Sequence, residues 1–99
     1  MNTIEEISKE ALTFWGYEPQ STMAIEEMGE LIKALCKYKR YGYDKSSQEI
    51  KNNLLEEIAD VHNMIDQLEI YFGVEEITKI RVDKLNRTKE RINKLKEEK

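Results

Sequence analysis

The sequence has little of what interrupts helices or cross-links a chain. Its 99 residues include one proline, four glycines, one cysteine and one histidine. A single cysteine excludes an intrachain disulfide and fits a reducing compartment, so we expect a cytoplasmic protein. The N-terminal segment is acidic and no long apolar run is present, so we expect neither a signal peptide nor a membrane partner. These absences leave a small helical protein as the first expectation.

Charge is plentiful but unevenly placed. Charged residues make up 36% of the chain and hydrophobic residues 39%, which suits one domain over residues 1–99, or an oligomer that completes its core with a partner chain. The net charge of −4 argues against a nucleic-acid or membrane binder. Residues 1–78 hold 7 basic and 16 acidic residues, whereas residues 79–99 hold 9 basic and 4 acidic ones. An acidic body and a basic last helix could therefore meet at an anionic ligand.

Apolar spacing and capping residues predict an all-α, four-helix bundle-like domain. The expected helices cover residues 3–15, 19–40, 47–72 and 74–97. Thr3 with Glu6, and Ser46 with Glu49, have the spacing of capping boxes, and Pro19 suits the first turn of a helix. Gly16 and Gly73 are stop signals, and residues 41–47 read as a turn.

Two apolar stripes lead us to expect inward faces on the last two helices. The third helix carries Ile50, Leu54, Ile58, Val61, Ile65, Leu68 and Phe72, and the fourth carries Ile77, Leu85, Thr88, Ile92 and Leu95. Cys36 lies within a helical run, so we expect a small buried side chain there. His62 lies off the stripe and is expected to be exposed or at an interface.

Four acidic residues are placed symmetrically about the expected turn. Glu27 and Glu30 precede it, Glu57 and Asp60 follow it, and each pair is spaced to share one face of a helix. If the two helices fold antiparallel, their rise of about 1.5 Å per residue brings all four carboxylates to one level. Facing carboxylates repel each other and are costly to desolvate unless a cation lies among them.

The type of ligand restricts the metal. A set of carboxylates without cysteine or a suitably placed histidine favours Mg²⁺ or Mn²⁺. Di-iron bundles use Glu-x-x-His pairs, and the residue three before His62 is Ala59. No serine or cysteine triad and no glycine-rich phosphate loop is visible. The sequence therefore predicts a hard-cation centre, although chance acidic pairs on a helix are common.

The same residues resemble the signature of the MazG-like nucleotide pyrophosphohydrolases, in the all-α NTP pyrophosphatase superfamily. That family's pattern is EExxE, a gap, then ExxD; here it reads Glu26-Glu27-Met28-Gly29-Glu30 and Glu57-Ile58-Ala59-Asp60. The gap is at or slightly beyond the long end of the family's range, which is a small departure from the pattern. The surrounding segments EEMGELIKAL and LLEEIADV are also similar to the family, and KLNRTKER resembles the basic last helix of small members.

The resemblance implies an enzyme. Glu27, Glu30, Glu57 and Asp60 would hold Mg²⁺, or Mn²⁺ in its place, and the reaction would be hydrolysis of a nucleoside triphosphate to a monophosphate and pyrophosphate. By the same resemblance the protein would act as a homodimer or homotetramer, with house-cleaning of the nucleotide pool as a possible role. The expected proton acceptor is Glu26 or Glu56, and the expected substrate contacts are Trp15, Lys84 and Arg87.

Alternatives remain open on the sequence alone. Relatives in this superfamily also hydrolyse a phosphoribosyl-ATP intermediate of histidine synthesis, so the substrate is not fixed. A helical interaction or regulatory module without activity would keep the same apolar pattern. A nucleic-acid binder using the basic last helix is the third reading, and the net charge weighs against it.

Overall fold

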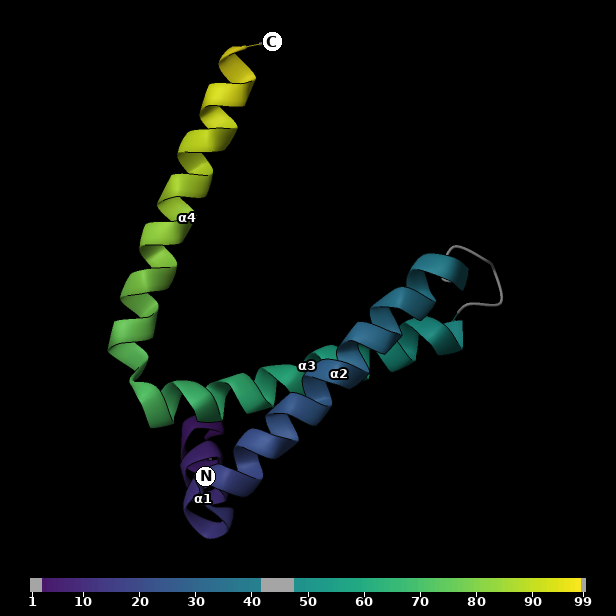
Figure 1. The fold of residues 1–99 in the computed structure, drawn as a ribbon, viewed down its shortest axis with the longest axis vertical. Coiled ribbons are helices and arrows are strands. Elements are labelled where there is room, and N and C mark those ends of the chain that lie inside the picture. The colour runs from purple at the N-terminus through teal and green to yellow at the C-terminus, as the bar shows by residue number, and fades with distance from the viewer. Residues whose placement is uncertain (1–2, 42–47, 99) are drawn as a thin grey trace.

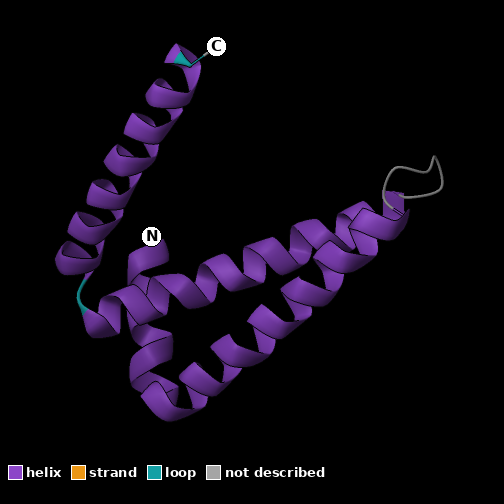
Figure 2. Ribbon diagram, turned by 45° about the horizontal axis from the view of Figure 1, so that its top comes forward, coloured by secondary structure: helices purple, strands orange, loops and turns teal. Residues whose placement is uncertain are grey.

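In a computed structural model, which describes residues 3–41 and 48–98, the chain folds into four helices. They are α1 (Ile4–Trp15), α2 (Tyr17–Tyr41), α3 (Gln48–Phe72) and α4 (Val74–Glu97) (Figure 1). The described residues contain no strand (Figure 2). The predicted all-α, four-helix bundle-like fold is confirmed.

The helix ends follow the local signals with one correction. Thr3 accepts a hydrogen bond from the Glu6 amide at 3.0 Å, and Gly16 and Gly73 adopt φ angles of 88° and 122°, which favour glycine. The second helix begins at Tyr17 rather than at Pro19. Proline is tolerated there because an amide in the first turn needs no partner within the helix. The predicted turn and its Ser46 cap lie largely outside the described residues.

The centre of the fold is the antiparallel pair of α2 and α3, which share the most extensive interhelical contact (Figures 1 and 2). Small and flexible side chains meet between them, with Ala24 and Ala34 from α2 and Leu54 and Met64 from α3 buried. Helix α1 packs against α3 and the start of α2. The narrow side chains of α2 let the two backbones approach each other, so the pair forms a stable base for the residues along its seam.

Two polar and aromatic contacts join the start of α2 to the end of α3. The Gln20 side-chain amide donates to the Gln67 side-chain oxygen at 2.8 Å, and Gln67 is itself buried. Tyr17 stacks on Tyr71 with ring centroids 4.2 Å apart, and Phe72 packs edge-on against both rings. These contacts fix the register of the pair at the end opposite the α2–α3 connection.

Helix α4 leaves the other three helices. It contacts α3 and no other described helix, and it projects away from the α2–α3 pair (Figure 1). The expectation of an inward apolar face on this helix is wrong within one chain, since Leu85 is 62% exposed and Leu95 57%. The physical reason is the chain direction after Gly73, which gives α4 no neighbour beyond its first turns.

The expected stripe on α3 is also only partly buried. Leu54 is buried and Val61 and Leu68 are half-buried, but Ile58, Ile65 and Phe72 are exposed. The helix turns the flank containing Glu57 and Met64 toward α2, so the other edge of the stripe faces solvent.

The single chain has more surface than its size requires. Its accessible surface is 8418 Å², whereas a compact monomer of its mass exposes about 5,900 Å². Its radius of gyration is 17.5 Å, against about 13 Å for a compact chain of this length. None of the described helices is long and apolar enough to cross a membrane.

Candidate metal centre

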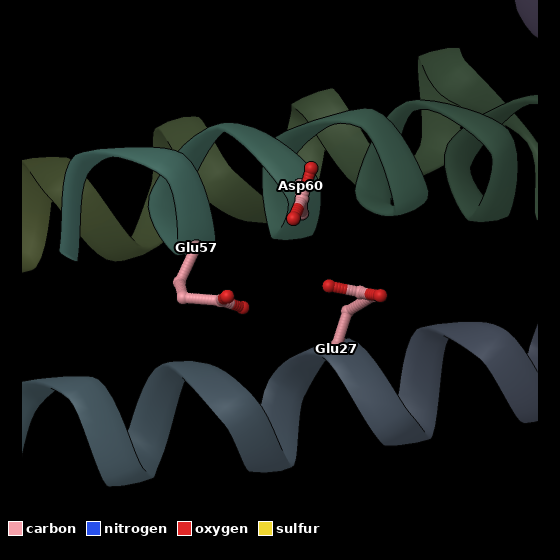
Figure 3. A group of neighbouring side chains, drawn as sticks. All are labelled: Glu27, Glu57 and Asp60. Carbon is pink, nitrogen blue, oxygen red and sulfur yellow. The ribbon is translucent and has the colours of Figure 1, made fainter. Parts of the chain in front are cut away.

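Three carboxylates from two helices converge in the seam between α2 and α3. Glu27 extends from α2 toward α3, and Glu57 and Asp60 face it from successive turns of α3 (Figure 3). One oxygen from each of the three lies within 4.8 Å of the others. The antiparallel pairing brings together residues that are 30 or more positions apart, as the symmetric spacing about the turn predicts.

The cluster is electrostatically unfavourable as three free anions. Burial, followed by the negative charges of Asp60 and Glu57, raises the pKa of Glu27 above its ordinary value. Burial, followed by the charges of Asp60 and Glu30, raises the pKa of Glu57 in the same way. Oε2 of Glu57 is buried and has no hydrogen-bond partner among the described residues. A cation or a proton in the seam would relieve both conditions.

The donor set fits a hard divalent cation. Mg²⁺ binds oxygen at about 2.0–2.1 Å, so two ligand oxygens on one ion lie no more than about 4.2 Å apart. The three oxygens lie within 4.8 Å of one another, so the widest separation is at most about 0.6 Å beyond this limit. Rotation of the carboxylate side chains can close that difference without moving a helix, because Glu27 and Glu57 are only half-buried.

The fourth predicted ligand lies at the margin of the cluster. Glu30 is one turn beyond Glu27 on α2 and its charge raises the pKa values of both Glu27 and Glu57. Its carboxylate lies 3.7 Å from the Lys33 ammonium, and both side chains are exposed. An exposed pair of this kind contributes little to stability, so the contact with Lys33 holds Glu30 only weakly.

The two candidate proton acceptors are each adjacent in sequence to a residue of the cluster. Glu26 and Glu56 are exposed and precede Glu27 and Glu57 in the chain. The negative charge of Glu56 is among the causes of the raised pKa of Glu57, whereas Glu26 acts on neither titrating residue.

The predicted substrate contacts lie away from the carboxylates. Trp15 ends α1, packs edge-on against Phe14 at 5.2 Å and is 57% exposed. From Tyr17, the start of α2, to Glu27 the helix rises by about 15 Å. Lys84 and Arg87 are exposed on α4, which makes no contact with α2. Within one chain the structure does not bring these three residues to the carboxylate cluster.

Two further expectations can be compared with the structure. His62 is exposed, as expected. Cys36 was expected to be buried and is instead a free, exposed thiol. Ala34 occupies the buried position, and a residue two places further on lies about 200° around the helix, so the correction follows from the helical period.

Two contacts that position the carboxylates of this centre were not predicted from the sequence. The Tyr17–Tyr71 stack and the Gln20–Gln67 hydrogen bond set the register that aligns Glu27 with Asp60. The available signal was the same mirror spacing about the turn, because Gln20 and Gln67 lie equally far from its middle.

Comparison of the chain with protein-family models, with curated proteins and with solved structures gives no match.

Proposed function

We propose that this chain is a Mg²⁺-dependent nucleoside triphosphate pyrophosphohydrolase, which cleaves between the α and β phosphates to give a monophosphate and pyrophosphate. The observation that carries the proposal is the convergence of Glu27, Glu57 and Asp60 in one seam, with an unpartnered buried oxygen on Glu57. The resemblance to the MazG-like hydrolases gives the cluster a reaction. The cluster alone is also compatible with a cation that only stabilises the fold.

In this proposal four acidic residues bind the cation and a fifth accepts a proton. Glu27, Glu57 and Asp60 would hold the cation from the two helices of the seam, and Glu30, one turn further along α2, would join them. Mg²⁺ held there would neutralise charge on the phosphate oxygens and lower the pKa of an attacking water. Glu56, or Glu26 in its place, would accept the proton of the water, since both side chains are exposed.

Substrate contacts in this scheme come from more than one chain. The phosphate contacts proposed for Lys84 and Arg87 require a second copy, because α4 leads away from α2 in its own chain. The same holds for Trp15 as a partner of the base. The enzyme is accordingly proposed to act as a homodimer or homotetramer, in keeping with the large apolar surface of the single chain.

The test is product analysis with a panel of ribo- and deoxyribonucleoside triphosphates in the presence of Mg²⁺, Mn²⁺ or EDTA. We expect monophosphate plus pyrophosphate, lost with EDTA. Glu57→Gln removes the charge of a proposed metal ligand. Mutation of residues that only hydrogen-bond to metal ligands already lowers metal affinity or activity by about 10–100-fold. We therefore expect the hydrolysis rate of the Glu57→Gln variant to fall by at least about 100-fold. Glu49→Gln, an exposed residue in the first turn of the same helix, is the matched control and should keep the rate.

Other outcomes would redirect the proposal. Diphosphate plus phosphate would show that the wrong anhydride bond has been assigned. No turnover of any triphosphate would make a phosphoribosyl nucleotide the next substrate to test. Failure on that substrate too would leave a helical interaction module, in which the cation has only a structural role.

A further inference from the structure

Helix α4 is exposed along its whole length after its first turn, yet its residues are not distributed as on a solvated helix. Leu85, Thr88, Ile92 and Leu95 follow one another at spacings of three, four and three residues, which places them on one face. The exposed fractions of Leu85, Ile92 and Leu95 are 62%, 42% and 57%. This face is the apolar stripe of α4, and no part of the described chain covers it.

The charges of α4 are ordered about this apolar stripe. At about 100° per residue, Lys84 and Arg91 border it on one side, and Lys89 and Lys96 border it on the other. The acidic residues Asp83, Glu90 and Glu97 recur every seven residues on the opposite face of the helix. The apolar stripe is thus bordered by positive charge on both sides, which selects an acidic, partly apolar docking surface.

A surface of that kind lies at the elbow where α3 meets α4. A hollow of about 500 Å³ opens there between α1, α3 and α4. Its apolar lining includes Ile4, Ile70 and Val74, and its acidic lining includes Glu5, Asp66 and Glu75. Glu69 also lines the hollow and lies 3.9 Å from Arg81, so this elbow groove already contacts one basic residue of its own α4.

We propose that the occupant of the elbow groove is the C-terminal half of α4, residues 84–96, from a second copy of this chain. The exchange is reciprocal: the two α4 helices lie antiparallel, and each C-terminal half reaches the other copy's elbow groove. A twofold axis perpendicular to α4 relates the two chains, so the contact is closed and needs no third chain. This inference specifies a contact for the homo-oligomer of the proposed function, and its test uses neither nucleotide nor metal, so hydrolysis is tested separately.

The area and the charges agree with this occupant. The surface in excess of a compact monomer, about 2,500 Å² per chain, is larger than the roughly 800 Å² that each partner buries in a standard interface. Two C-terminal halves of α4 would not pair with each other, because basic residues border both apolar stripes and would face one another. The lining of the elbow groove instead combines carboxylates with apolar side chains.

The experiment is a charge exchange measured by light scattering and sedimentation on the full chain, without nucleotide or metal. Variant one carries Lys89→Glu and Arg91→Glu on the two borders of the apolar stripe. Variant two carries Asp66→Lys and Glu75→Lys in the elbow groove. The unaltered chain should have twice its 11.7 kDa mass, and each variant alone should be monomeric, with dimerisation weakened by at least about 100-fold. Mixing the two variants should restore a heterodimer, since both docking contacts then pair opposite charges.

The control changes the same charge on the outer face of α4. Lys79→Glu with Lys94→Glu should leave the dimer intact. Ile92→Asp is an independent variant, which should abolish the dimer without loss of helical circular dichroism because Ile92 is exposed in the single chain. A monomeric unaltered chain overturns the proposal, as do variants that stay dimeric or a mixture that stays monomeric. Salt-sensitive binding of oligonucleotides by a monomer would assign the basic borders to nucleic acid instead.

Discussion

Helices α2, α3 and α4 are of nearly equal length, but α2 and α3 pack against each other whereas α4 is largely exposed to solvent. Helices α2 and α3 have 25 residues each and α4 has 24, yet α2 and α3 contribute five buried residues and α4 contributes none. The pair completes its own seam and holds the carboxylate centre within one chain. The apolar stripe of α4 is exposed, because no described part of the same chain packs against it. One chain therefore contains the whole carboxylate cluster, whereas no described part of that chain covers the apolar stripe of α4.

The largest expected effect is the difference in unfolding free energy lost when a leucine is shortened in the α2–α3 pair or in α4. Leu54→Ala removes a side chain that is 8% exposed in the α2–α3 seam, so we expect a loss of about 2–4 kcal/mol in the free energy of unfolding. Leu85→Ala removes an exposed side chain from α4 and should cost less than about 0.5 kcal/mol in dilute protein. Urea denaturation at several protein concentrations measures both.

The concentration dependence sharpens the same comparison. Any loss caused by Leu85→Ala should grow with protein concentration, because only a dimer covers that side chain. The loss caused by Leu54→Ala should be the same at every concentration. Equal losses at high dilution would show that α4 packs within its own chain, contrary to the observed arrangement.

Cation binding should act on the pair and leave α4 unaffected. At a Mg²⁺ concentration ten times its dissociation constant, we expect about 1.4 kcal/mol of stabilisation, a rise of several degrees in the melting temperature. Calorimetry with and without Mg²⁺ measures the rise, which Glu57→Gln should abolish and the α4 variant Glu90→Gln should not. An unchanged melting temperature in the unaltered chain would count against a cation in the seam.

The smallest effect is a dependence on pH in the absence of metal. Because folding raises the pKa of Glu27 and Glu57 above the ordinary value of 4.5, their ionisation in the folded state opposes folding. Stability should therefore increase as the pH falls from neutrality through the raised values, and the increase should be complete below the unfolded value. The effect is small because both side chains are half-exposed and solvent screens them.

Urea midpoints between neutral pH and mildly acidic pH would measure this slope. The double substitution Glu27→Gln with Glu57→Gln should flatten it, and addition of Mg²⁺ to the unaltered chain should weaken or reverse it, since protons then compete with the cation. A slope that survives the double substitution would assign it to other carboxylates.

Much of the fold was accessible from local signals in the sequence. The cap of Thr3 and the stops at Gly16 and Gly73 depend only on neighbouring residues, and the structure confirms them. The approach of Glu27 to Glu57 and Asp60 was also predicted, because an antiparallel pair with one turn relates positions by simple mirror counting. The positions of Glu30, Trp15, Lys84 and Arg87 were not determined in this way. They depend on side-chain rotation or on helices whose neighbours are set by packing.

The sequence by itself determined that this chain is helical, where most helices begin and end, and which carboxylates can meet. Those properties follow from the 3.6-residue period and from capping, which act over a few residues. Only the tertiary structure decided which edge of each apolar stripe is buried, that Cys36 and the apolar stripe of α4 face solvent, and that α4 leaves the body. Those outcomes depend on the direction that the chain takes after Gly73. They also depend on which apolar helix faces pack together, because the four helices have more apolar surface than their neighbours can cover. A period along one helix contains no information about which faces pack together.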